Sequence, residues 1–334
     1  MTPDESKEFV GYAYEMAFHR KPSENEMEIF SEKLERGEVT QTQFLRMCLD
    51  ANEFRIRNAV KSTFPMGHYH SPVVDPSTVV EYLKNEGALK PENLKGVKID
   101  IAAMRELWRK HLPFTREHLV SVRTNSNDRF RYGDGPFPEG DALSLQLMFA
   151  EFRPRRVIEI GSGFSTACML DSAERLGLTE VKITCIEPYP DRLQSLLRPT
   201  DKIELIQKPI QDVDCTLVDE LEPNDILFID STHVMKTGSD VHFEFFYLLP
   251  RLKPGVVVHF HDVGFPFEYP NKWVFEFNYS WNEAYVLRAF MMYNTAFEIV
   301  FWNSLLYREP DVREEFTLQS GNPGSSIWLR RSGA

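Results

Sequence analysis

Arg156-Val-Ile-Glu-Ile-Gly-Ser-Gly-Phe-Ser-Thr166 is the segment from which the architecture of this chain follows. Its apolar run from Val157 to Ile160 ends in Gly161-Ser162-Gly163, and an amphipathic segment comes directly after. This pattern predicts a buried parallel strand that turns through a glycine loop into a helix. Glycines let a ligand approach the backbone, and the first amides of a helix are free to bind a polar group. We therefore expect a nucleoside-bearing cofactor at this loop.

From about residue 140 onward, short apolar runs alternate with amphipathic segments, which is typical of a parallel α/β sheet. Five candidate strands precede a helical stretch around residues 283–292, and two more strands follow it. The seven candidates are Val157–Ile160, Lys182–Ile186, Ile203–Ile206, Asp225–Ile229, Val256–Phe260, Phe297–Trp302 and Ser326–Leu329.

Acidic residues occur where these strands end. Glu159 lies just before the glycine turn, and Glu187 follows the second strand. Open α/β sheets bind ligands at the carboxyl ends of their strands, and a carboxylate there can accept two hydrogen bonds from a ribose diol. We favour this role for Glu187 over that of a helix cap. After the third strand, Pro209-Ile-Gln-Asp212 is placed to border an adenine.

The first 60 residues predict a small all-helical domain for docking or interaction. Phe9, Tyr12 and Met16 share one helical face, while Ser23 with Glu26 forms a capping box. A second box, Thr40 with Gln43, starts a third helix. We expect residues 61–129 to be a linker with a helical lead-in, and residues 130–334 to be the cofactor-binding domain.

Composition narrows the class of protein. The 334 residues carry a net charge of -12, which argues against a protein that tracks nucleic-acid phosphates. The four cysteines form no C-x-x-C pair, so neither a disulfide framework nor a zinc site is expected. An acidic N-terminus without an apolar run, and no apolar run long enough to span a bilayer, lead us to expect a cytoplasmic protein.

The glycine loop departs from the dinucleotide fingerprint G-x-G-x-x-G, because Thr166 stands where the third glycine would be. With the strand order above, residues 130–330 resemble a class I S-adenosylmethionine (SAM)-dependent methyltransferase. The resemblance implies a Rossmann-like seven-stranded α/β sheet with helices on both faces and its last strand antiparallel. It also implies that the loop binds the methionine part of SAM, Glu187 the ribose and Asp212 the adenine; the loop residues are Glu159, Gly161, Ser162, Gly163 and Ser165.

More closely, the chain resembles a methyltransferase subgroup defined by sequence blocks rather than by substrate. Its blocks here are Ile158-Glu-Ile-Gly-Ser-Gly-Phe-Ser165, Asp230-Ser-Thr-His233, Gly238-Ser-Asp240 and His259-Phe-His261-Asp262, with Tyr132-Gly-Asp134 and Glu139-Gly-Asp141 before them. Residues 1–60, closing in Ala51-Asn-Glu-Phe54-Arg, resemble a helical domain of unknown function that is often fused to glycosyltransferases and methyltransferases.

Asp230 and Asp262 end the fourth and fifth strands, so both are predicted catalytic residues at one crevice rim, with Asp230 also near the cofactor. Methylating an alcohol requires a base, and His233 is the best candidate because its free pKa is close to neutrality. The alternative is a histidine that only orients Asp230. Metal-dependent catechol-type methyltransferases place an Asp and a base at this offset, so Asp230, His261 and Asp262 could hold a divalent metal such as Mn²⁺ or Fe²⁺. We expect His259 to be structural.

The sequence thus predicts SAM-dependent O-methylation of a small-molecule or sugar hydroxyl. Aromatic residues after the fifth strand, in 265–273 and 279–283, suit either a sugar-binding surface or an aromatic core beneath a lid. Two rival functions remain at this stage. One is a SAM-binding scaffold without catalysis, which would serve a protein partner or a second copy through residues 1–60. The other is an NAD-dependent oxidoreductase, which Thr166 and the final strand pair disfavour.

Overall fold

The computed structural model describes residues 1–18, 20–51, 64, 66–87, 89–124, 128–131, 136–317 and 321–333. Its contacts divide the chain into two compact units, Met1–Asp75 and Pro76–Ala334. Two segments used for the resemblance, residues 52–55 and 132–134, lie outside the described residues.

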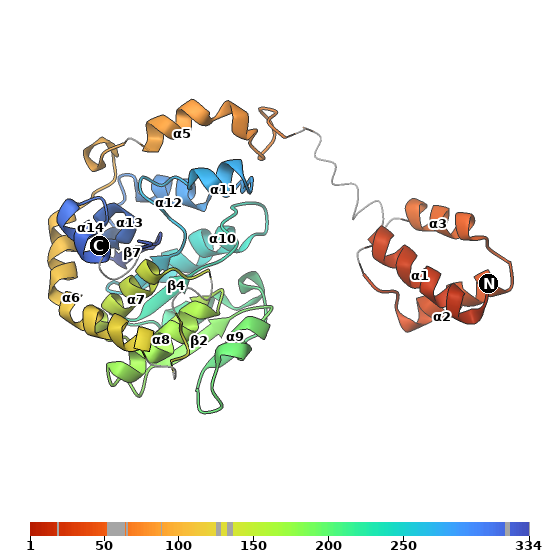
Figure 1. The fold of residues 1–334 in the computed structure, drawn as a ribbon, viewed down its shortest axis with the longest axis horizontal. Helices are drawn as coiled ribbons and strands as arrows, with labels where there is room; N and C mark the ends of the chain where they lie inside the picture. Colours follow the sequence, from red (N-terminus) through yellow and green to blue (C-terminus); the bar gives the residue numbers. More distant parts are fainter. Residues whose placement is uncertain are drawn as a thin grey trace. The chain divides into compact units, whose positions relative to one another are not determined.

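The first unit contains three helices, α1 (Pro3–Phe18), α2 (Glu24–Glu35) and α3 (Gln41–Asp50). Both predicted capping boxes are present: Ser23 caps α2 with Glu26, and Thr40 caps α3 with Gln43. The three helices enclose one hydrophobic core, drawn in red to orange in Figure 1, whose buried residues are Val10, Ala13, Tyr14, Ala17, Phe18, Leu34, Phe44 and Cys48.

Of the three residues that share one face of α1, Phe9 packs against this core, but Tyr12 and Met16 do not. Tyr12 and Met16 are each 61% exposed, whereas Ala13 and Ala17 are buried together with Tyr14. Small side chains let neighbouring helices approach closely, so α1 turns its alanine face inward and leaves two larger apolar side chains in solvent.

The second unit is built on a seven-stranded sheet with the order β3-β2-β1-β4-β5-β7-β6. Strands β1 to β5 are parallel, and β7 is antiparallel to both β5 and β6. The strands are β1 (Arg156–Ile160), β2 (Lys182–Ile186), β3 (Glu204–Ile206), β4 (Ile226–Ile229), β5 (Val257–Phe260), β6 (Phe297–Trp302) and β7 (Ile327–Arg331). All seven predicted strands and the antiparallel last strand are confirmed; β2 and β6 have the predicted bounds, and the ends of the others differ by at most two residues.

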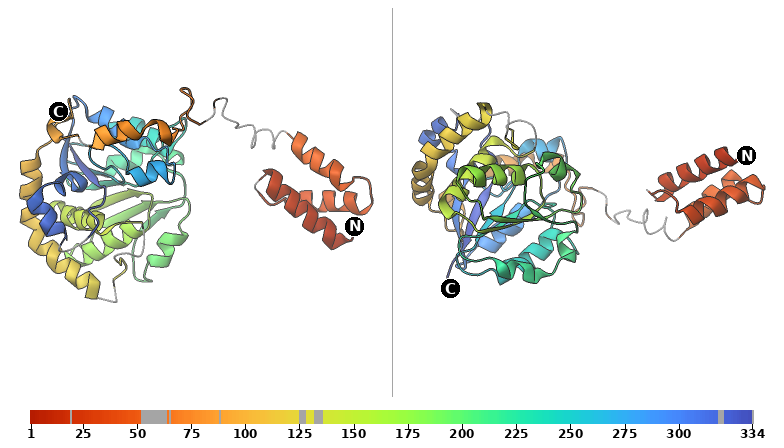
Figure 2. Two further views of the ribbon diagram at one scale, coloured as in Figure 1. Left: turned by 45° about the horizontal axis from the view of Figure 1, so that its top comes forward. Right: turned by 90° about the horizontal axis from the view of Figure 1, so that it is seen from below.

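Helices cover both faces of this sheet (Figures 1 and 2). On one side lie α6, α7 and α8, and on the other α10 and α12. The α-helices of this unit are α5 (Val80–Gly87), α6 (Ile101–Thr124), α7 (Glu139–Phe152), α8 (Phe164–Arg175), α9 (Asp191–Leu196), α10 (Asp240–Phe243), α11 (Asn271–Phe275), α12 (Glu283–Met291), α13 (Asn303–Leu306) and α14 (Pro310–Thr317). Among the described residues, no helix has both the length and the apolar character that crossing a membrane would need.

Strands β1 and β4 are neighbours at the centre of the sheet, where the strand order reverses direction between β1–β2–β3 and β4–β5. Ligands of open α/β sheets bind at such a switch point, outside the carboxyl ends of the strands. The residues that follow β1, β2, β4 and β5 therefore define the region in which a site is expected.

Candidate active site

The glycine turn after β1 brings two strand ends into close contact. Gly161 has φ +77°, and a Cβ atom built on it would lie 1.8 Å from the carbonyl oxygen of Asp230. Its N–H donates to the carbonyl of Ile186 at 3.0 Å. Only glycine fits here. A side chain would collide with the backbone of Asp230, and residues with a side chain rarely adopt the left-handed conformation. The turn thereby ties the ends of β1, β2 and β4 together.

Glu159 organises this turn from beneath. It is buried, and its carboxylate accepts a 2.6 Å hydrogen bond from Ser165 Oγ and another from Thr166 Oγ1. Thr166 Oγ1 also accepts the N–H of Gly163 at 3.1 Å, so Thr166 closes the first turn of α8. Glu159 does not line the adjacent cavity, which corrects its predicted contact with the cofactor: its carboxylate is committed to the loop hydroxyls.

Burial raises the pKa of Glu159 to about 7, although the hydrogen bonds from Ser165 and Thr166 lower it. In the folded chain Glu159 therefore keeps a proton that, in the unfolded chain, it releases above its ordinary pKa of 4.5. Since the folded state binds more protons between these values, the free energy of unfolding falls as pH rises, by up to about 3 kcal/mol for this group. We expect Glu159→Gln to flatten this fall in urea unfolding at pH 5 and pH 7.5. The exposed Glu298→Gln should keep the wild-type slope, and an unchanged slope in Glu159→Gln would contradict this role.

Glu187 occupies the position predicted for a ribose ligand. Its carboxylate accepts the N–H of Ser162 at 3.1 Å and that of Tyr189 at 2.8 Å, so two backbone amides fix its orientation. It lines two adjoining hollows, one of about 370 Å³ and one of about 380 Å³. The second hollow has largely apolar walls, which include Ile186, Pro188, Tyr189, Pro209 and Ile210.

Of the segment predicted to border the adenine, residues 209–211 line the apolar hollow, but Asp212 does not. Asp212 is exposed and lines neither hollow, whereas Gln211 lines the apolar one. Residues 210–212 form a 3-10 turn, so successive side chains point in different directions. A loop pattern in sequence does not reveal this rotation.

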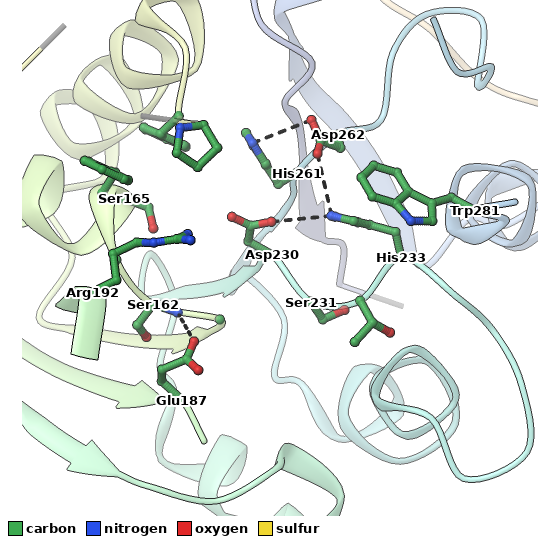
Figure 3. A pocket seen from close by; sticks show the side chains of 16 residues that line it. Ser162, Ser165, Glu187, Arg192, Asp230, Ser231, His233, His261, Asp262 and Trp281 are labelled. Atoms are coloured by element: carbon green, nitrogen blue, oxygen red, sulfur yellow. Dashed lines mark hydrogen bonds and ion pairs between the residues drawn. The ribbon is translucent and has the colours of Figure 1, made fainter. Parts of the chain in front are cut away.

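The polar hollow gathers the predicted catalytic residues (Figure 3). Nε2 of His233 lies 3.6 Å from Oδ1 of Asp230 and 3.6 Å from Oδ2 of Asp262. Nε2 of His261 lies 3.6 Å from the other oxygen of Asp262. Strand β5 ends at Phe260 and Asp262 has φ +56°, so the chain turns and both His261 and Asp262 line the hollow.

Glu283, at the start of α12, contacts the other ring nitrogen of His233, Nδ1. It was not predicted as a partner of this histidine. Its Oε2 lies 2.8 Å from Nδ1 of His233, and its side chain is 1% exposed. The N–H groups of Asn282 and Glu283 also donate to the carbonyl of His233 at 3.0 and 3.2 Å. His233 adopts φ +61°, a conformation that is costly for such a residue and persists only where the surroundings enforce it.

The three histidines of this region differ in charge. Burial disfavours the charge of His233, yet the hydrogen bond to Glu283 and the charges of Asp230 and Asp262 raise its pKa above 6.5. Burial also opposes the charge of His261, but Asp230, Asp262 and Asp141 raise its pKa to about 9.

His259 has the opposite character. Burial and the charge of His261 hold its pKa well below 6.5, and Nε2 lies 2.8 Å from Ser326 Oγ. Its ring stacks on Phe228 with centroids 3.7 Å apart. His259 is therefore a neutral core residue, as predicted.

The predicted metal site is not formed. In the described parts of the chain, no three His, Cys, Asp or Glu side chains are arranged to hold a metal ion. Asp230 directs its carboxylate toward His233, and His261 pairs with Asp262 instead. Asp262 also lies 3.6 Å from His233, so both predicted carboxylate ligands face histidine nitrogens.

Two further residues line the hollow: Trp281, from the aromatic segment 279–283, and Arg192, which was not predicted. Trp281 packs against His233 with ring centroids 4.4 Å apart and stacks on Tyr279 at 4.5 Å. Tyr269 and Trp273 pack around the same ring, so Trp281 belongs to a partly exposed aromatic cluster and lines the hollow. On the opposite wall, Arg192 extends from α9 toward the hollow (Figure 3).

Comparison with known proteins agrees with this architecture. A family model described as "Methyltransferase domain" matches residues 158–263, from β1 to just beyond β5. A protein of Archaeoglobus fulgidus, described as uncharacterized, is 31% identical over 178 residues. That alignment covers 49% of this chain and 76% of the relative.

Solved structures with similar folds include an SAH-bound methyltransferase, PaMTH1, of Podospora anserina (16% identity, 76% of this chain, 97% of that chain, TM-score 0.40). Another is the apo form of CmcI-N160 (19% identity, 59% and 73% covered, TM-score 0.37). A third is the plantazolicin methyltransferase BpumL with SAH (12% identity, 70% and 100% covered, TM-score 0.40). The family match, the strand order and the glycine turn lead to one conclusion: this chain belongs to the class I SAM-dependent methyltransferases.

Proposed function

We propose that this enzyme methylates a hydroxyl group of a small molecule or of a sugar, with His233 as the general base. The observation that supports the proposal is the way in which the two ring nitrogens of His233 are placed. Its Nδ1 is bonded to the buried Glu283, while Nε2 lies in the polar hollow between Asp230 and Asp262. An imidazole held in this way presents one nitrogen to an incoming hydroxyl.

The two hollows suit SAM in their chemistry. Glu187 offers carboxylate oxygens to a ribose diol at the boundary between them, and apolar side chains with Gln211 form walls for an adenine. The polar hollow places Arg192 where a carboxylate could bind, and Asp230 where an ammonium or sulfonium charge could be balanced. When bound, SAM supplies an electrophilic methyl group on a positively charged sulfur.

Glu187→Gln should weaken SAM binding without unfolding the chain. Gln keeps the size of the side chain but replaces one acceptor and the negative charge, and a hydrogen bond to a charged group is worth about 1.5–3 kcal/mol. We therefore expect the Kd for SAM to rise roughly 10- to 100-fold in titration calorimetry. The exposed Glu180→Gln, before the start of β2 and so at the other end of that strand, should bind SAM normally. Equal affinity in Glu187→Gln and wild type would remove Glu187 from the site.

The pKa of an alcohol lies far above 7, so an alcohol keeps its proton in neutral water. Its methylation therefore benefits from a positioned base. The neutral form of His233 accepts the proton at Nε2, and the carboxylate of Glu283 stabilises the resulting imidazolium through Nδ1–H. Because the pKa of His233 is raised, we expect the base to become active only above its usual value of 6.5. The reaction rate should accordingly rise with pH through that pKa.

His261 supports the same chemistry in another role. With a pKa of about 9 it carries a positive charge at neutral pH, which makes it a poor general base. It lines the hollow beside Asp262 and can stabilise negative charge that develops on the acceptor oxygen. Of the two histidines, His233 is therefore the stronger candidate for the base.

The size of the polar hollow supports a small acceptor group. The reactive end of the cofactor and the acceptor hydroxyl share a space of about 370 Å³, which suits one ring or a short chain rather than a folded macromolecule. Trp281 supplies an aromatic surface at this wall. A single sugar at the end of a glycan fits this description as well as a free small molecule does.

Transfer of radiolabelled methyl groups from SAM tests the proposal. Purified chain would be incubated with labelled SAM and with separate pools of sugars, glycans, phenols and amines, and the products separated. We expect label in a hydroxyl-bearing pool as an alkali-stable methyl ether. Label confined to amines would refute the O-directed reaction, and SAM binding without transfer to any pool would favour the scaffold alternative.

A further inference from the structure

Near Glu283, the partner of His233, lies a second buried carboxyl group that the proposed chemistry does not use. Glu244 begins a π-helical segment, Glu244–Leu248, which directly follows α10. Its side chain is 0% exposed. Segments of π-helix are rare and often occur at functional sites, because they displace a side chain from the regular helical spacing.

Glu244 and Glu283 are each short of hydrogen-bond donors. Ser231 donates to Oε2 of Glu244 at a long 3.3 Å, and His233 binds Oε2 of Glu283. In both residues the Oε1 atom is buried and, within the described part of the chain, has no hydrogen-bond partner. Two buried carboxylates in this state would carry two negative charges with His233 as their adjacent cation, which is costly in a site without water.

The other charged groups that face this pair add to the repulsion. Asp240 lies on α10, and its carboxylate accepts from Thr232 N–H and hydroxyl at 3.0 and 2.6 Å. Asp230 lies on the far side of His233. Burial, followed by the charges of Glu283 and Asp240, raises the pKa of Glu244 well above its ordinary value.

We propose that Glu244 is a neutral carboxylic acid in the resting enzyme, so that Glu283 is the only charged member of this buried glutamate pair. Glu244 contacts Ser231 and lies near the charge of Glu283, and it has no part in the transfer itself. If Glu244 were ionised, its negative charge would raise the pKa of His233 further and slow the release of the proton. The neutral acid avoids this. The effect of Glu244 on catalysis rests on the proposed role of His233 as the base. The protonation state of Glu244 does not depend on that role.

Infrared difference spectroscopy of the full-length chain, without any substrate, tests the protonation state directly. Wild type minus Glu244→Gln at pH 7 should contain the C=O stretch of a protonated carboxylic acid, which shifts in D₂O. Other protonated carboxyls, such as Glu159, cancel in the difference. The exposed Glu276→Gln should give no such band. Absence of the band in wild type minus Glu244→Gln would overturn the proposal.

The titration of His233, followed by NMR of ¹⁵N-histidine, gives an independent readout. Gln is a neutral mimic of the protonated acid, so Glu244→Gln should leave the pKa of His233 unchanged, whereas Glu283→Gln should lower it. A lowered His233 pKa in Glu244→Gln would show that Glu244 is ionised and would overturn the proposal. If Glu244→Gln did not fold, Glu244→Met would serve, since it is neutral and of similar length.

Once an acceptor is known, kinetics separate this inference from the proposed function. Glu244→Gln should then keep a kcat close to wild type, and Glu283→Gln should lose roughly 10²–10⁴-fold. If both variants retained full activity while the spectra matched the expectation, the proposal that Glu244 is neutral would be retained. The proposal that His233 is the base would be refuted.

Discussion

His233→Asn should lower methyl transfer by about 10²–10⁴-fold, the range expected when a positioned general base is removed. Asparagine is the appropriate replacement because His233 has φ +61°, a left-handed conformation that Asn tolerates better than Ala. The carbonyl of residue 233 would still accept the N–H groups of Asn282 and Glu283, so the loop should keep its shape. Labelled methyl transfer measures the loss, and calorimetry with SAM should give an affinity close to wild type.

His242→Asn is the matched control for this variant. His242 is a partly exposed residue of α10 that packs on Phe246 and lines neither hollow. It should keep wild-type activity and affinity. Retention of more than about a tenth of the activity in His233→Asn would exclude His233 as the base. Loss of SAM binding in that variant would instead assign it to cofactor binding.

Gly161→Ala should have the largest effect on the folded state and on SAM binding. The alanine Cβ would lie 1.8 Å from the carbonyl oxygen of Asp230, and that oxygen cannot move without displacing the end of β4. The left-handed conformation adds about 1–2 kcal/mol of strain. We expect several kcal/mol of destabilisation and at least a 100-fold weaker binding of SAM, because Asp230 and the turn would be displaced together.

Gly177→Ala is a control with the same backbone conformation but without the contact. Gly177 has φ +66°, and nothing lies within 4 Å of a Cβ built on it. It should lose about 1–2 kcal/mol, or a few degrees in Tm, and bind SAM normally. Similar losses of stability and binding in the two variants would mean that strain, rather than the contact with Asp230, explains the requirement for glycine at position 161.

Most of the sheet could be predicted because its signals are local. A buried parallel strand such as Val157–Ile160 is mostly apolar and is bounded by turn or polar residues, so each strand is visible within a short window. The face of α1 could not be predicted in this way. Tyr12 and Met16 are larger than Ala13 and Ala17, but the close packing of α2 and α3, rather than side-chain size, determines which face is buried.

The active site could be predicted only where its residues end strands. Asp230, His233 and Asp262 were recognised because the ends of β4 and β5 meet at one edge of the sheet. Glu283 is 50 residues from His233, and its contact depends on how the segment after β5 folds back. The Trp281-Asn-Glu sequence marked that segment as aromatic and polar, but nothing in it indicated a buried partner for a histidine.

Glu159 and Asp212 illustrate the opposite error. Their types and positions suit a cofactor ligand, yet Glu159 is buried beneath the glycine turn, where it accepts hydrogen bonds from Ser165 and Thr166. At residues 210–212 the 3-10 turn brings Gln211 rather than Asp212 to the hollow. The orientation of a side chain within a short turn depends on dihedral angles that a sequence pattern does not specify.

A crystal structure of the enzyme with S-adenosylhomocysteine tests the central claim most directly. We expect both ribose hydroxyls on Glu187, the adenine between the apolar walls beside Gln211, and the sulfur in the polar hollow with Nε2 of His233 facing the space beyond it. A cofactor bound elsewhere, or a sulfur separated from His233 by another side chain, would contradict the assignment of His233 as the base.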